Sequence, residues 1–411
     1  MMGRKIWIVG ALCMLFGSGY SQSLDDLLKT VVENNVELKA LQLEYEAQLL
    51  KVDQVTQLPN PQLGVGVPVL RPETRLGPQV MMVNASQMFP WFGTFKAKKD
   101  VVISMSKAKY ESISAIRLSL FTKVKVAYYQ LQFLEQKEVT LGKILKQFEG
   151  LKSISLGKVE SGSGSSANVL RIQLKIDELD QVIRKLLPEK EKLYAAINSI
   201  TQQPWETVIT PQEPEAVAVL EFNLEEYLAK IKAHEPLMLK FDQQIQASQD
   251  RQLANKKMNS LMFGIGLNYT LVNERTDMNP EFNGRDILVP KLMLSIPLYR
   301  KSYKARNAEE VLNQEALLLR KESIETRIIS QLIQFKAGYD NALLDIELNQ
   351  HQMETTSSIY EMLLSNYSAN GSGFDGLLQV QNQLLQYQLG IFKSEMMARI
   401  AKANIDRYTD Y

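Results

Sequence analysis

The residue types that most often do chemistry in proteins are few and scattered in this chain of 411 residues. The two histidines, His234 and His351, each stand alone in a polar helical stretch, and we interpret them as exposed surface residues. The glycine-rich segment 162–166 lacks the lysine of a phosphate-binding loop and follows a helix instead of a strand. With no recognisable catalytic constellation, the sequence predicts a protein that is not an enzyme and uses no cofactor.

Methionine is the one residue type that gathers where metal chemistry could occur. Thioether sulfur can bind soft cations such as Cu(I) or Ag(I). Methionine also packs adaptably against apolar surroundings. We favour packing, because some of these side chains would lie on the apolar face of a strand, and the sequence therefore predicts no metal site. The methionines on or near strand-like segments are Met81, Met82, Met88, Met262 and Met293.

The N-terminal residues 1–21 have the pattern of a signal peptide. Basic Arg4 and Lys5 precede an apolar run too short to span a bilayer, and small residues follow it. The single cysteine, Cys13, lies in this segment, so we expect neither disulfides nor thiolate metal sites in the exported chain. The formal net charge is +1 with both signs interspersed, which argues against nucleic acid as a partner.

Short motifs recur in the same order in the two halves of the chain. FKAK at 95–98 returns as YKAR at 303–306, and GVGV at 64–67 returns as GIGL at 264–267. SGSG at 161–164 is likewise matched by NGSG at 370–373, at an offset of about 208 residues. This order predicts a duplicated half-molecule, with repeats at 22–200 and 223–411 and a proline-containing linker at 201–222.

Each repeat is predicted to run helix, two strands, long helix, turn, helix. Strict alternation marks the strands, and apolar residues spaced by threes and fours mark coiled-coil-like helices. The fold class is therefore mainly α with a small β part. In the first repeat the expected helices are 24–57, 94–156 and 167–200, around a hairpin at 62–89. In the second they are 224–258, a long helix up to the glycine turn, and 374–408, around a hairpin at 260–297.

The expected strands carry apolar residues on one face and Gly, Asn, Ser or Thr on the other, which is typical of an outer-membrane barrel. Aromatic residues gather where the return strands end and could form a belt at the membrane interface. The alternative is aromatic core beside a helix N-terminus with solvated lysines. The belt residues are Phe89, Trp91, Phe92, Phe95, Tyr299 and Tyr303.

Four strands are too few to close a barrel, and open strand edges are not tolerated in lipid. The chain is therefore expected to form a homotrimer, whose three copies supply a 12-stranded β-barrel. No second apolar stretch of about 20 residues is present, so no membrane helix is expected.

The ordered set of motifs resembles the TolC-type outer-membrane efflux proteins over nearly the whole exported chain. PNPQLGVGV at 59–67 is similar to the family's entry to its first strand. The segments 86–99 and 294–306 resemble its strand-to-helix crossings, and 161–173 and 370–385 resemble its helical-hairpin turns. The crossing MFPWFG is most similar to the heavy-metal-efflux branch.

The resemblance implies the exit duct of a tripartite efflux or type I secretion system. Such a duct is a homotrimer in the outer membrane, with a periplasmic α-barrel carrying most of the chain. Its partners are a periplasmic adaptor and an inner-membrane pump of RND or ABC type. The alternative is a non-conducting periplasmic coiled-coil adaptor or scaffold, although nothing here is similar to an adaptor's β-rich modules.

The resemblance also places the periplasmic entrance and the adaptor-docking surface at the two glycine turns. Asn168 and Asp375 lie near the family's common acidic position after these turns, so three-fold symmetry would make Asp375 a ring of three carboxylates. A role for Asp375 as a helix N-cap is the alternative. The turn residues implied are Gly162, Gly164, Asn168, Gly371, Gly373 and Asp375.

Overall fold

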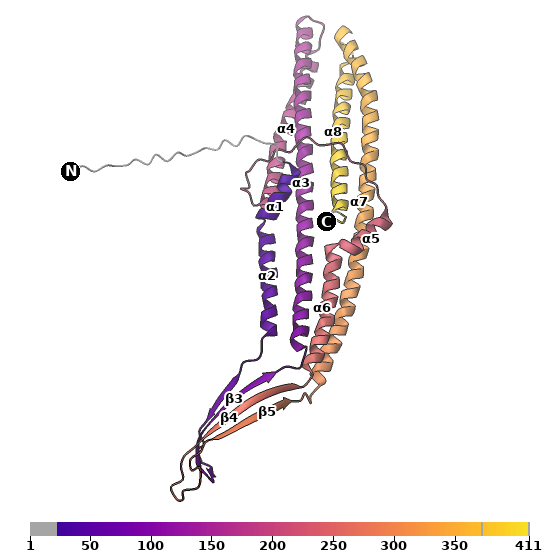
Figure 1. Ribbon diagram of the computed structural model, residues 1–411. Coiled ribbons are helices and arrows are strands. Elements are labelled where there is room, and N and C mark those ends of the chain that lie inside the picture. The colour runs from indigo at the N-terminus through magenta and orange to yellow at the C-terminus, as the bar shows by residue number, and fades with distance from the viewer. Residues whose placement is uncertain (1–22, 371–372, 410–411) are drawn as a thin grey trace, which may run out of the picture. The chain divides into compact units, whose positions relative to one another are not determined.

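The computed structural model describes residues 23–370 and 373–409, so the expected signal peptide and Gly371 lie outside the described residues. Helices and strands follow in nearly the same order in the two halves of the chain, and the first half has the additional short strand β2 (Figure 1). The first series is α1 (Leu24–Asn34), α2 (Val36–Thr56), β1 (Gln62–Gly66), β2 (Glu73–Thr74), β3 (Gly77–Phe89), α3 (Thr94–Glu160) and α4 (Ser166–Thr201). The second is α5 (Leu224–His234), α6 (Pro236–Met258), β4 (Met262–Val272), β5 (Ile287–Ser295), α7 (Lys301–Asn370) and α8 (Phe374–Asp406).

The chain forms two compact units, and each takes residues from both expected repeats. We call residues 37–117 and 223–331 the sheet unit, which holds all the strands together with α2, α5, α6 and the first parts of α3 and α7. The helical unit contains α1, α4, α8, the later parts of α3 and α7, and the linker before α5. No helix among the described residues combines the length and apolar character needed to cross a membrane.

The sheet is antiparallel, with strand order β1-β3-β4-β5 and with β2 paired to the start of β3. Directly paired residues share a face, so the register defines the composition of each face. One face carries Leu63, Ala85 and Leu267 in a single row, and the opposite face carries Gly64, Asn84 and Asn268 in the next. Within the hairpin expected at 62–89, β1 pairs with β3. Within the hairpin expected at 260–297, β4 pairs with β5.

Two expected helices are each broken once. The stretch 24–57 breaks at Asn35, whose backbone is extended and whose buried side chain donates to the Ile200 carbonyl at 2.8 Å. The stretch 224–258 breaks at Glu235, where the following Pro236 disfavours helical backbone in the preceding residue. Helical periodicity alone did not predict either break.

An apolar core joins the two helical hairpins of the helical unit. On α3 and α4 its members recur every seventh residue, which is the spacing of coiled-coil seams. Residues of α7 and α8 complete the same cluster, so the α3–α4 pair packs against the α7–α8 pair. The buried members are Leu134, Leu141, Phe148, Ile172, Leu179, Leu186, Tyr367, Phe374, Leu377 and Leu385.

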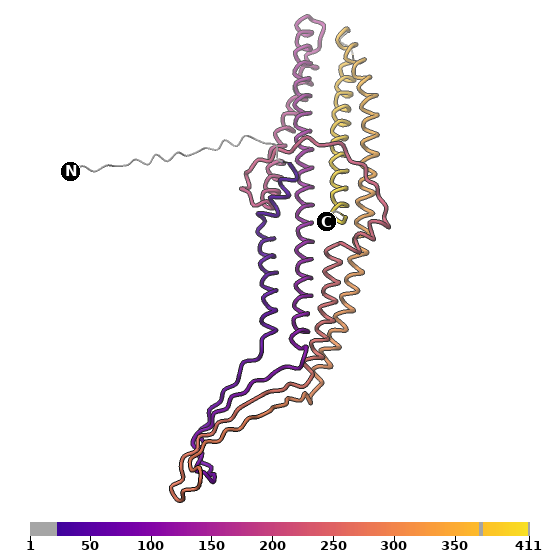
Figure 2. Tube along the Cα trace, viewed as in Figure 1, coloured from indigo at the N-terminus to yellow at the C-terminus, as the bar shows by residue number. Residues whose placement is uncertain are grey.

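The linker, residues 202–222, lies against the helices of the helical unit as an extended strap (Figure 2). Side chains from several helices bind its backbone. Asn198 of α4 donates to the carbonyls of Trp205 and Thr207 at 3.2 and 2.8 Å, and Tyr339 of α7 donates to Ala218 at 2.6 Å. The strap thus ties both hairpins together by polar contacts.

Replacing Asn198 by alanine should release the first part of the strap. Asn198 is fully buried, and its loss leaves two carbonyls without their donor, at a cost of about 1–3 kcal/mol. Cleavage by a glutamate-specific protease at Glu206 or Glu213 should therefore become faster. Asn404→Ala is the matched control, because the Asn404 amide donates only to Ile400 in its own helix. Equal cleavage of the two variants would contradict the role of Asn198.

Candidate functional site

The turn between α3 and α4 depends on two glycines for different reasons. Gly162 has a φ of 75°, a left-handed conformation that glycine adopts without strain. Gly164 has ordinary backbone angles, but a Cβ there would lie 2.8 Å from the carbonyl carbon of Lys158. Ser165 then caps α4 by accepting from the Ala167 backbone at 3.3 Å, and Asn168 lies in the first turn of α4.

The turn between α7 and α8 is described from residue 373 onward. Gly373, with a φ of 83°, occupies the N-cap position of α8, so Asp375 is not the cap. Asp375 lies instead in the first turn, where a carboxylate interacts favourably with the helix dipole.

An ion pair joins the beginnings of α4 and α8. Arg171 Nη1 lies 2.5 Å from Asp375 Oδ1, and the two side chains are 53% and 78% exposed. Such an exposed pair contributes about 0–1 kcal/mol and is weakened by salt. The pair therefore adds only a weak link between the two hairpins.

A second polar contact joins the ends of α3 and α7. Lys158 Nζ donates to the carbonyls of Tyr367 and Ser368 at 2.8 and 3.2 Å, where the dipole of α7 favours a cation. The Tyr367 hydroxyl lies 2.9 Å from Ser155 Oγ, in a buried hydrogen bond. We call these contacts, together with the Arg171–Asp375 pair, the turn-end latch. Sequence reasoning missed Arg171, Lys158 and Tyr367, because their partners lie on the other hairpin.

The structure brings three of the six expected belt residues into one aromatic cluster at the end of β3. The Phe89 and Phe263 rings stack at 5.4 Å, Phe92 lies 5.8 Å from Phe263, and Trp91 meets Phe92 edge to face. Phe92 and Trp91 are exposed at 72% and 39%. Phe263, on the neighbouring strand, was not expected in this cluster.

The other three belt residues occupy different surroundings. Tyr299 precedes α7 and is 92% exposed. Phe95 and Tyr303 are half-buried near the starts of α3 and α7, and the Tyr303 carbonyl accepts from Asn255 at 2.9 Å.

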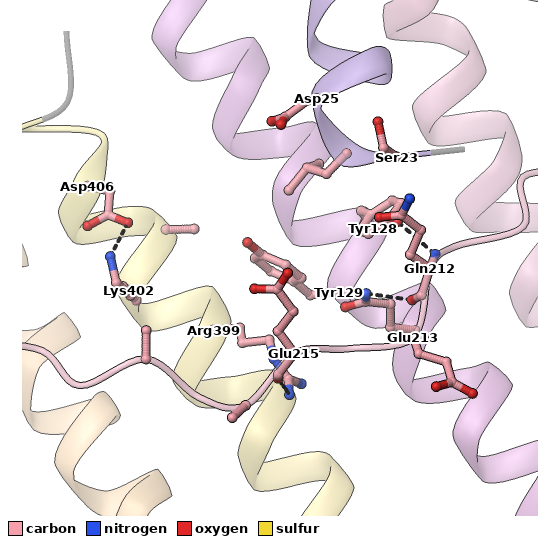
Figure 3. A pocket seen from close by; sticks show the side chains of 15 residues that line it. Ser23, Asp25, Tyr128, Tyr129, Gln212, Glu213, Glu215, Arg399, Lys402 and Asp406 are labelled. Atoms are coloured by element: carbon pink, nitrogen blue, oxygen red, sulfur yellow. Dashed lines mark hydrogen bonds and ion pairs between the residues drawn. The ribbon is translucent and has the colours of Figure 1, made fainter. Parts of the chain in front are cut away.

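A cavity beside the strap is lined by several charged and hydroxyl side chains (Figure 3). Its groups hold the structure together: the Tyr128 hydroxyl accepts from the Gln212 backbone, Lys402 pairs with Asp406 at 2.7 Å, and Arg399 donates to the Glu215 carbonyl. Burial, with the Asp406 carboxylate, raises the pKa of the Tyr129 hydroxyl. No cluster of His, Cys, Asp and Glu suited to a metal is present in the described part of the chain.

Comparison with solved structures finds several of closely similar fold. The outer-membrane channel OprN has a TM-score of 0.74 at 14% identity, over 94% of this chain and 89% of its own. CusC, whose structures were described in connection with transmembrane channel formation, has a TM-score of 0.74 at 12% identity, over 94% of this chain and 91% of its own. The Campylobacter jejuni CmeC outer membrane channel has a TM-score of 0.72 at 12% identity, over 94% and 85%. No family model and no curated protein sequence matches this chain.

These likenesses confirm the resemblance to TolC-like outer-membrane efflux proteins at the level of the fold. The chain has the fold of outer-membrane efflux channels, mostly helical with a small antiparallel sheet. Within this fold, the turn-end latch and the aromatic cluster are the two groups of residues from which a function can be inferred.

Replacing Tyr367 by phenylalanine should loosen the turn end without disturbing the core. The substitution removes the hydroxyl that contacts Ser155 but keeps the ring, at a cost of about 0.5–1.5 kcal/mol. Backbone amides in 155–170 should then exchange with deuterium faster, as mass spectrometry can measure. Tyr387→Phe makes the same change at a partly buried position of α8 and should leave the exchange rates in 155–170 unchanged. Unaltered exchange in Tyr367→Phe would exclude this contact from the latch.

Proposed function

We propose that this protein is an outer-membrane channel, the exit duct of a tripartite efflux or type I secretion system. The observation that carries the proposal is a sheet with an exposed apolar face and, within the described residues, no strand partner at either edge; its strands continue into long helices in the fold of efflux channels. It would conduct passively, without catalysis, with most of the chain in the periplasm. A periplasmic adaptor and an RND or ABC pump would be its partners, and the repeated element order would reflect duplication.

The strand directions support closure by three copies. All neighbouring strands are antiparallel, so β1 and β5 at the two edges also run in opposite directions. The free edge of β5 in one copy can therefore pair in antiparallel fashion with β1 of the next. Three copies would then close a barrel of 12 strands, which removes every open edge from lipid.

The exposed face of the sheet supports contact with hydrocarbon. Leu63 is 78% exposed, Ile265 53% and Leu292 90%, all on the apolar face that the register defines. A continuous apolar surface of this kind marks a contact with lipid or protein. The opposite face, with its glycines and asparagines, would line the lumen.

The turn-end latch supports a gate at the periplasmic entrance. Docking of an adaptor on the glycine turns would compete for the exposed Arg171–Asp375 pair and let the turns at the ends of the hairpins move apart. The entrance residues of this proposal are Gly162, Gly164, Asn168, Gly371, Gly373 and Asp375, of which Gly371 lies outside the described residues.

Trp91 should lie at the lipid interface in reconstituted protein. Interfacial aromatic rings reach the acyl-chain boundary, so brominated phospholipids should quench Trp91 fluorescence. Trp91→Phe should abolish this quenching, whereas Trp205→Phe should preserve it, because Trp205 lies on the strap and is 66% exposed. Loss of quenching in Trp205→Phe, or a protein found entirely in the soluble periplasm, would overturn the membrane location.

Breaking the Arg171–Asp375 pair should increase leak through the channel. Arg171→Gln or Asp375→Ala is expected to raise the open population about 1.5- to 5-fold per pair, given the usual strength of exposed pairs. Conductance in planar bilayers should be recorded near 0.1 M salt, because 1 M salt shortens the Debye length to about 3 Å.

Arg184→Gln is the control for this measurement, since it makes the same charge change on α4 but breaks only a pair with Asp180 in the same helix. The exchange of Arg171→Asp with Asp375→Arg should restore the low conductance. Equal leak in Arg184→Gln, or failure of the exchange, would remove the pair from the gate.

A further inference from the structure

The register of the sheet places three methionines around one glycine. Met88 on β3 and Met293 on β5 are both paired directly with Gly264 on β4, one from each side. Met262 is two residues before Gly264 on the same strand and so shares its face. Met81 lies on the apolar face, so it is the one strand methionine that would meet lipid in the proposed barrel.

Gly264 makes room for the thioethers. A Cβ added there would lie 2.4 Å from Met88 Sδ and 3.1 Å from Met293 Cε, so both side chains bend over the glycine from opposite neighbouring strands. Gly266 continues this space, because a Cβ there would lie 3.6 Å from Met293 Cε. All three methionines are half-buried, which leaves the cluster within reach of solvent.

Two thioether side chains, those of Met88 and Met293, meet at Gly264, and Met262 adds a third on the same face of the sheet. Thioether sulfur is a soft, neutral ligand that selects Cu(I) and related monovalent ions over hard divalent ones. The flexible methionine side chain can bring its sulfur to a common point without moving the strand. The nearest charged residue on this face is Lys291, one row away opposite Gly266. Its positive charge opposes a bound cation, so any affinity must come from the thioether sulfurs.

We propose that Met88, Met262 and Met293 form a binding site for a soft monovalent cation on the glycine-rich face of the sheet. Binding by itself requires only the sheet unit. A role as a stopping point for such cations in the lumen rests on the proposed channel function, in which the trimer would carry three of these sites.

The site can be tested with Ag(I), a soft ion that needs no reductant. Protein labelled with ¹³C at the methionine methyl groups is purified in detergent and titrated with silver nitrate in chloride-free buffer. The methyl signals of Met88, Met262 and Met293, assigned by single Met→Leu variants, should shift together with one ion per chain. Met88→Leu or Met293→Leu should weaken binding about ten-fold or more, since even outer-shell changes weaken metal sites 10- to 100-fold.

Two controls separate ligand loss from disturbance of the fold. Met278→Leu changes an exposed methionine in the loop between β4 and β5 and should leave the Ag(I) affinity unchanged. Gly264→Ala keeps all three thioethers, but its methyl group must displace the Met88 sulfur, so it should also weaken binding. Excess Zn(II) should not compete.

The proposal is overturned if the three methyl signals do not shift, or if the double variant Met88→Leu/Met293→Leu binds Ag(I) like the unmodified protein. Because binding is measured in detergent, it is independent of conduction. Protein that binds Ag(I) but fails the bilayer and lipid-quenching measurements would refute the channel and leave the site intact.

Discussion

Backbone hydrogen bonding at the two edges of the sheet is the constraint on which the rest of the architecture depends. Among the described residues, β1 pairs with β3 and β5 with β4, so each has one side without a strand partner. Water can satisfy such groups, but hydrocarbon cannot. One face of the sheet, however, is apolar and suits hydrocarbon better than water. A single copy cannot meet both demands, whereas a ring of copies meets them together. The proposed trimer and the proposed membrane location therefore depend on each other.

The contacts within the helical unit differ widely in strength. Truncating a buried leucine such as Leu141 or Leu179 to alanine costs about 2–5 kcal/mol. The seam buries one such large apolar residue in each of three successive heptads of α3 and of α4. The exposed pair between Arg171 and Asp375 is worth about 1 kcal/mol at most. Loss of that pair would therefore leave the buried core between the hairpins in place and loosen only the polar contact between their turns. The strap, bound by Asn198 of α4 and Tyr339 of α7, also connects the two hairpins.

Glycines on one face of the sheet decide which neighbouring side chains can approach one another. At Gly64 the space is taken by the amide of Asn84, whose Oδ1 would be 2.4 Å from a Cβ. At Gly264 the same kind of space is taken by thioethers from two strands. The backbone geometry of the two positions is similar, and the difference in chemistry comes from the residues across the register. At Gly264 the absence of a side chain thus leaves the space in which the proposed site lies.

The sequence by itself determined what depends on neighbours along the chain. Alternation located the strands, apolar spacing located the long helices, and the glycine motifs at 161–164 and 370–373 located the turns. Tertiary structure decided whatever joins distant segments. Asn35 ends α1 while binding a carbonyl 165 residues away, and Arg171 meets Asp375 across 204 residues. Strand register likewise brought the methionines together. Such pairings depend on which elements lie side by side, and periodicity within one segment contains no information about its neighbours in space.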